Sequence, residues 1–261
     1  MGTISGQIVD KATGEPIEAR VKVVDSRGNF AHPPKALLKV GPGQPFFYSG
    51  GSFQVDVERG YTTISVERGT EYVPQEVTVY APAHGAITVD LKVDRWSELG
   101  TKGWHPGNTH IHYDEKETRP DDRLMLDPRV EDLRMTAISI LKRWDLEYAS
   151  NKFAPGFLND LSSTHYHVQC GEENRHNANG THSIGYGHVM FLNISNIVHP
   201  VSRGLLVDAF DPDYPPLSYA CDDTKRQGGV VIWCHNGQGL SLIHISEPTR
   251  PRLISYAVFC L

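Results

Sequence analysis

Two histidines spaced two residues apart, His110 and His112, are well suited to holding a metal ion. They lie in the stretch 108–112, which directly follows the turn residues Pro106 and Gly107. Side chains two residues apart in an extended strand point the same way, so both imidazoles would lie on one face. Neutral imidazole is the commonest metal ligand among side chains. With 13 histidines in the chain, such a pair also arises by chance, so further ligands must decide.

A carboxylate for the same ion is expected at Glu173. If a strand over 166–171 continues in extended backbone, His165, His167, Gln169 and Glu173 lie on one of its faces. Glu172 lies on the other face. If the face with the polar side chains is turned toward the ion, Glu173 points at the ion and Glu172 does not. The alternative is that both are solvated loop acids.

Two more histidines stand at the ends of apolar strands. His188 follows Gly187 and precedes an apolar run, and His235 follows the run at 230–234. Either could also be a hydrogen-bonded structural histidine. Together with Glu173 and the histidine pair they make a mixed nitrogen and oxygen ligand set. Such a set suits zinc, the ion we expect, with manganese or iron as alternatives.

The composition limits the partners. The 261 residues allow one large or two ordinary domains, and 39% hydrophobic with 21% charged residues is typical of a soluble globular protein. A net charge of −6 argues against nucleic acid or an anionic membrane as partner. No apolar run is long enough to span a bilayer, and the first residues do not resemble a signal peptide. The four cysteines lack metal-knuckle or disulfide-scaffold spacing, which favours free thiols.

Residues 1–95 are expected to form an antiparallel β-sandwich. Short alternating segments at 4–9, 19–24, 53–57, 61–67 and 87–93 are separated by turn residues every eight to twelve positions. The opening segment 4–17, ISGQIVDKATGEPI, resembles the carboxypeptidase regulatory-like, transthyretin-like sandwich family. That resemblance implies an accessory module of an exported bacterial protein, in the periplasm or outside the cell.

Residues 96–239 are expected to form a second domain of the α/β class. Apolar runs at 109–113, 135–141, 166–171, 189–194 and 229–234 alternate with polar stretches, and Asp127 with Pro128 resembles the start of a short helix. This pattern favours a parallel barrel, in which functional residues gather at the carboxyl ends of the strands.

The order of these motifs resembles the PHP-like metal-dependent hydrolases, of the carbaryl-hydrolase (CehA/McbA-like) type. The motifs are His-x-His, Gly-x-Glu, Gly-His and Gly-Gly leading to a histidine, and they span about 103–239. The resemblance implies a distorted barrel with two or three divalent ions that activate water to cleave phosphoesters or carboxyl and carbamate esters. It implies as ligands His110, His112, Glu173, His188 and His235, with the glutamate able to bridge two ions.

The sequence departs from that family in two places. The Thr-Asp-His triplet that usually ends the second strand corresponds to Ser139, Ile140 and Leu141, which removes one ligand. The late Asp-x-His ligands would lie beyond Gly239. There the segment 240–261, LSLIHISEPTRPRLISYAVFCL, resembles a translated sequencing-library adapter, so we expect it to be an artefact and the barrel to be truncated.

These observations predict a metal-dependent hydrolase that acts on a small-molecule ester or phosphoester through metal-activated water. A second hypothesis is a non-catalytic binding protein, in which a degenerate barrel is joined to a sandwich that attaches to a surface. A third is a structural protein whose histidines are satisfied within the core. Metal content separates the first from the second, because fewer than one bound divalent ion per chain would favour the binding protein. The third predicts that mutating His110 and His112 leaves the metal content unchanged.

Overall fold

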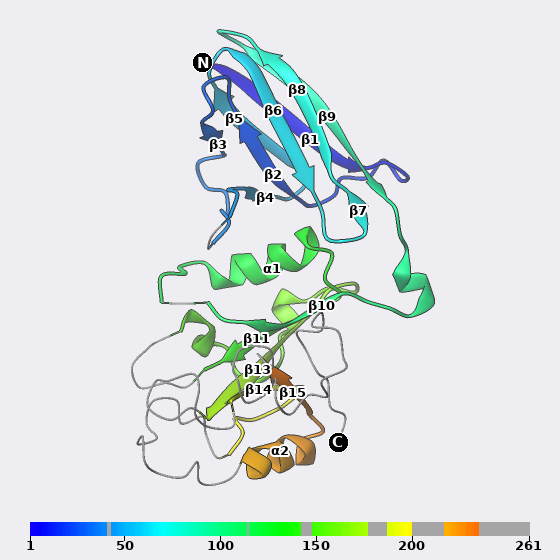
Figure 1. The fold of residues 1–261 in the computed structure, drawn as a ribbon, viewed down its shortest axis with the longest axis vertical. Helices are drawn as coiled ribbons and strands as arrows, with labels where there is room; N and C mark the ends of the chain where they lie inside the picture. The colour runs from blue at the N-terminus through cyan, green and yellow to red at the C-terminus, as the bar shows by residue number, and fades with distance from the viewer. Residues whose placement is uncertain (41–42, 114, 142–147, 177–186, 200–216, 235–261) are drawn as a thin grey trace, which may run out of the picture. The chain divides into compact units, whose positions relative to one another are not determined.

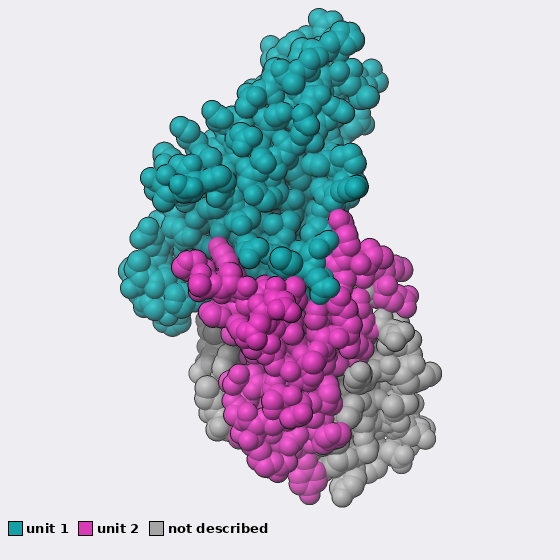
Figure 2. Space-filling model, turned by 180° about the vertical axis from the view of Figure 1, so that it is seen from behind, with its two compact units in different colours: residues 1–107, 121–134 teal, residues 108–120, 135–261 magenta. Residues whose placement is uncertain are grey.

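The computed structural model describes residues 1–261 except 41–42, 114, 142–147, 177–186, 200–216 and 235–261 (Figure 1). The proposed adapter segment therefore lies outside the described residues. The chain packs into two compact units, coloured in Figure 2. The first unit holds residues 1–107 and 121–134, and the second holds 108–120 and 135–261. This division follows packing alone, so the predicted domain boundaries stay predictions.

The first unit is a β-sandwich. One sheet has the order β5-β1-β9-β7. The other has the order β3-β2-β6-β8, with β4 pairing β2. Alternate residues of both sheets, among them Ile4, Val21, Ile64 and Leu91, are fully buried in one shared apolar core. The strands are β1 (Gly2–Asp10), β2 (Ala19–Val24), β3 (Phe30–Ala31), β4 (Phe47–Ser49), β5 (Ser52–Val57), β6 (Gly60–Glu67), β7 (Tyr72–Val73), β8 (Gln75–Ala81) and β9 (Ala86–Arg95).

The sandwich is not purely antiparallel. β1 pairs with β5 in antiparallel fashion but with β9 in parallel, from Thr3 beside Ala86 to Asp10 beside Val93. The predicted all-antiparallel arrangement is therefore wrong at this pair. Period-two alternation reports which face of a strand is buried, and that pattern is the same for both strand directions.

Helix α1 (Pro120–Val130) packs its residues from 121 onward with the sandwich unit. It begins eight residues before Pro128, where the sequence predicted the helix start, so that expectation is wrong. Pro120 at the first turn, followed by Asp121 and Asp122, is the favourable way to begin a helix. Arg123 donates a hydrogen bond to the backbone oxygen of Leu38 at 2.9 Å, which ties the helix to the sandwich.

A buried ion-pair network surrounds Asp132, just after α1. Its carboxylate lies 3.3 Å from Arg68 and 2.7 Å from Arg95, and only 4% of its side chain is exposed. Arg95 also pairs with Glu71 and donates to the hydroxyl of Tyr72 at 2.8 Å. Burial opposes the charge on Arg95, but Asp132 and Tyr72 outweigh it and raise the pKa of the guanidinium. The network fixes the segment after α1 within the first unit.

The second unit does not form the predicted α/β barrel. Its described strands make one open sheet in the order β10-β11-β13-β14-β15, with β12 pairing β13. β11 and β13 are parallel, but β13 and β14, and β14 and β15, are antiparallel. A barrel of this class needs parallel neighbours joined by helices. The strands are β10 (Gly107–Ile111), β11 (Met135–Ile140), β12 (Gly156–Phe157), β13 (His167–His176), β14 (Gly187–Leu192) and β15 (Val230–Cys234).

Side chains are buried on both faces of this sheet, which explains why its strands suggested a barrel. One face buries Ala137, Met190 and Ile232 in one cluster. The other buries Val189 and Phe191 against helix α2 (Leu217–Arg226). Burial on two faces gives unbroken apolar runs whatever the strand direction, so the runs did not fix the topology. Within the described part of the chain, no helix is long and apolar enough to cross a membrane.

Candidate metal centre

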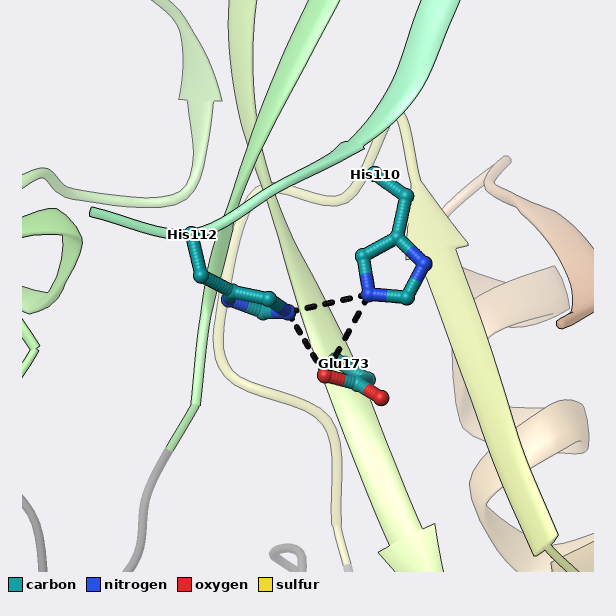
Figure 3. Close-up of side chains that lie close together, drawn as sticks. All are labelled: His110, His112 and Glu173. Atoms are coloured by element: carbon teal, nitrogen blue, oxygen red, sulfur yellow. Dashed lines mark hydrogen bonds and ion pairs between the residues drawn. The ribbon is translucent and has the colours of Figure 1, made fainter. Parts of the chain in front are cut away.

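Strand β10 brings the two histidines together (Figure 3). His110 lies in the strand, and His112 follows one residue after its end. The backbone N–H of His110 donates to Asn108 Oδ1 at 3.0 Å, which holds the chain here. The two Nε2 atoms lie 3.1 Å apart, and the rings are nearly perpendicular at 87°. The spacing of two residues in extended backbone accounts for this convergence.

The ring of His112 is oriented by the neighbouring strand. Its Nδ1 lies 3.0 Å from the backbone oxygen of Ser139 on β11. A carbonyl oxygen can only accept, so Nδ1 carries the proton and donates it. The Nε2 atom is thereby directed at the cluster. A metal-binding histidine is commonly held in this way, through its other ring nitrogen. The ring of Tyr148 also lies against His112, with centroids 5.6 Å apart.

Glu173 on β13 completes the cluster from below. Its side chain is fully buried, and its Oε2 lies 2.6 Å from His112 Nε2 and 3.6 Å from His110 Nε2. Glu172 lies on the opposite face, where it accepts hydrogen bonds from the backbone of Val198 at 2.8 Å and from Asn174 at 3.4 Å. Neither acid is a solvated loop residue, because both have 0% exposure.

His188 contacts the second oxygen of the same carboxylate. Its Nδ1 lies 2.8 Å from Glu173 Oε1, and 12% of its side chain is exposed. Register explains the contact, because β13 and β14 pair Glu173 with Met190, two residues beyond His188 on the same face. Glu173 thus presents Oε2 to the β10 histidines and Oε1 to His188.

The close contacts require a proton or a metal ion between these atoms. With the proton on Nδ1, a neutral His112 offers only a lone pair at Nε2, 2.6 Å from a carboxylate oxygen. Two lone pairs at that distance repel each other. A proton shared between the ring nitrogen and the carboxylate removes the repulsion, and so does a metal ion held between the atoms. The arrangement is therefore either a buried hydrogen-bonded pair of histidine and glutamate or a cation site.

The distances fit a metal ion. The ligand atoms of His110, His112 and Glu173 all lie within 4.8 Å of one another. With bonds of about 2.1 Å, neighbouring ligands are about 3.0 Å apart in octahedral and about 3.4 Å apart in tetrahedral geometry. The separations of 2.6, 3.1 and 3.6 Å span these values. Two imidazoles and a carboxylate are also a donor set that zinc, manganese and iron accept.

The remaining expected ligands are outside the cluster or outside the described residues. His235 lies beyond the described part of the chain. Of the positions aligned with the triplet, Ile140 and Leu141 are buried and apolar. Both backbone groups of Leu141 bind the side chain of Asn151, at 2.9 Å each, which ends β11.

Sequence reasoning missed two parts of the site, the backbone oxygen of Ser139 and the ring of Tyr148. Ser139 was considered only as the position of a lost ligand, yet its backbone oxygen orients His112. Tyr148 follows the range 142–147, which is not described, and no spacing pattern linked it to the histidines. Cys170, on the face opposite Glu173, is not a reactive thiol, because burial raises its pKa to about 12.

Comparison with known proteins gives no family. No protein-family profile and no curated protein matches the chain. Solved structures that align include a group B streptococcus pilus 2b backbone protein, with 14% identity over 38% of this chain and a TM-score of 0.27. The C-terminal domain of the shaft pilin SpaA from Lactobacillus rhamnosus GG aligns with 15% identity over 36% and a TM-score of 0.24. The aligned part spans 43% of the first protein and 97% of the second. Similarity this low carries no argument about function.

Proposed function

We propose that the chain is a metal-dependent hydrolase that cleaves a small-molecule ester or phosphoester. The observation that carries the proposal is the convergence of His110, His112 and Glu173 on one point, with the proton of His112 held away from that point. The barrel is not needed for this site. Strand β10 with the residue that follows it, and strands β11, β13 and β14 of the open sheet, supply the groups involved.

The residues divide into ligands and supports. His110 and His112 would hold the ion through Nε2, and Glu173 through Oε2. His188 contacts Glu173 Oε1 at 2.8 Å and so restrains the carboxylate. When bound, a divalent ion in such a set lowers the pKa of a coordinated water toward neutrality and polarises a scissile oxygen.

The charges of the chain's own groups favour this chemistry. Two neutral imidazoles and one carboxylate supply a single negative charge, which a divalent ion exceeds by one. The site then keeps net positive charge, which attracts a phosphoester anion or the oxygen of an ester carbonyl. The histidines are 19% and 13% exposed, whereas Glu173 is fully buried. A ligand would therefore approach from the histidine side.

A non-catalytic binding protein is the second candidate. It would use the same cluster to hold a metal ion for structure or for ligand capture. The absence of a triplet ligand at Ile140 and Leu141 supports it, because fewer ligands are then available for a multinuclear site. It predicts metal binding without hydrolysis.

The test is metal content and hydrolysis measured on the same preparation of the full chain. We expect about one zinc, manganese or iron ion per chain, and turnover of a chromogenic phosphodiester or carboxyl ester that requires the ion. His112→Ala and Glu173→Gln should lose both. His84→Ala replaces an exposed turn histidine and should keep both.

The outcomes separate the hypotheses. Metal binding without hydrolysis of either substrate class supports the binding protein. If the protein holds less than one ion per chain and His112→Ala changes nothing, the cluster is a structural ion pair and the proposed function is wrong.

A further inference from the structure

Strand β11 lies between the two strands that supply the metal ligands. The sheet order places it between β10, which carries His110, and β13, which carries Glu173. On β11, Ser139 pairs with Gly171, two residues before Glu173 on β13. Paired residues share a face of a sheet, as do residues two apart. The side chain of Ser139 is therefore on the face that carries the Glu173 carboxylate.

The hydroxyl of Ser139 is buried and makes no hydrogen bond to any residue that the structure describes. The residue has 0% exposure, and no described group lies within hydrogen-bonding geometry of its Oγ. A buried hydroxyl without a partner is unfavourable, and such groups are rare in folded proteins. Its backbone oxygen, in contrast, accepts the Nδ1 proton of His112. The residue thus contacts a ligand by its backbone and offers a hydroxyl on the same face.

Nothing else on β11 could take this role. The β11 side chains on this face are those of Met135, Ala137 and Ser139. Serine is the polar one among them. Opposite it, Gly171 has no side chain. The imidazole of His112 and the carboxylate of Glu173 meet across this strand, 2.6 Å apart. A small polar side chain on this face of β11 leaves room for an ion and offers an oxygen to it.

We propose that the Ser139 hydroxyl is the fourth protein donor of the metal centre, acting on the bound ion directly or through a group that the ion holds. This inference rests on the proposed metal site. It assigns the unpaired hydroxyl a partner that is present only when the ion is present. Ser139 is then a determinant of metal affinity and not a packing residue.

The test compares zinc affinity of the full chain, its Ser139→Ala variant and a matched control. Loss of a group that supports a metal site lowers affinity roughly 10–100-fold, so we expect at least about a tenfold loss in Ser139→Ala. The control is Thr136→Val, which removes another buried hydroxyl without a hydrogen bond, from the opposite face of the same strand. It should leave zinc affinity unchanged.

A Ser139→Cys variant loaded with cobalt(II) shows how the side chain acts. A thiolate-to-cobalt absorption band absent from the wild type means direct contact. No band, together with the loss in Ser139→Ala, means contact through a group bound to the ion. Thermal unfolding of each variant shows whether it is folded. Without metal, Ser139→Ala should be at least as stable as the wild type, because it removes a buried hydroxyl that had no partner.

Failure of the role of Ser139 and failure of the metal site give different results. If the wild type binds zinc and Ser139→Ala binds it equally well, without a band in Ser139→Cys, the role of Ser139 is wrong and the metal site stands. If the wild type binds neither zinc nor cobalt, the proposed metal site itself fails and this inference fails with it.

Discussion

Replacing Glu173 by glutamine keeps the shape of the side chain and removes its charge. The carboxylate is fully buried and makes two close contacts, at 2.6 Å to His112 and 2.8 Å to His188. A hydrogen bond to a charged group contributes about 1.5–3 kcal/mol, against about 0.5–1.5 kcal/mol for a neutral one. For two such contacts, we expect Glu173→Gln to lower the free energy of unfolding of the metal-free protein by about 2 kcal/mol. This value already includes the smaller cost of burying a neutral amide.

The effect with metal should be larger. Zinc at a thousandfold excess over its dissociation constant stabilises a protein by about 4 kcal/mol if it binds the folded state only. We expect the wild type to gain about that much and Glu173→Gln to gain almost none. The assay is urea denaturation of both proteins, with zinc and with a chelator.

One result would refute this reasoning. If zinc stabilises Glu173→Gln as much as the wild type, the carboxylate is not a ligand. The contacts to His112 and His188 would then be a buried ion pair that holds the sheet together.

Three further predictions concern the rest of the chain. Asp132→Ala leaves Arg68 and Arg95 without their shared buried carboxylate and should destabilise the first unit by about 3–5 kcal/mol in urea denaturation. Lys11→Ala, which breaks an exposed pair, should cost less than about 1 kcal/mol, and equal losses would contradict this account. Burial raises the pKa of Cys170 to about 12, so this thiol should react with a thiol reagent at pH 8 only after the protein unfolds. Peptide mapping locates the labelled cysteine, and rapid labelling of Cys170 in the folded protein would disprove this. Burial raises the pKa of Glu131, so the folded state binds that proton more tightly than the unfolded state. This stabilising contribution is present below about pH 4.5 and is lost as pH rises through the folded pKa. Glu131→Gln should therefore gain stability relative to wild type between pH 4 and 7, and a constant difference across that range would count against it.

Local spacing was enough to predict which of the site's side chains share a face of their strand. His110 and His112 converge because extended backbone repeats every two residues, and the same alternation separates Glu173 from Glu172. These relations hold within a single strand, so they do not depend on how the strands are arranged. His188 reaches Glu173 through pairing of two adjacent strands, which spacing alone does not reveal.

Strand direction could not be obtained in this way. The runs at 189–194 and 229–234 are apolar because both faces of the sheet are covered, and this is true of parallel and antiparallel strands alike. The expected barrel was wrong for that reason. The role of Ser139 was also hidden, because it depends on β11 lying between β10 and β13.

The most direct test of the metal centre is a crystal structure of the full chain grown with zinc, with anomalous diffraction recorded at the zinc edge. The account predicts a peak about 2.1 Å from His110 Nε2, His112 Nε2 and Glu173 Oε2. An absence of anomalous density there, with His112 and Glu173 still 2.6 Å apart, would contradict it and identify the cluster as a structural ion pair.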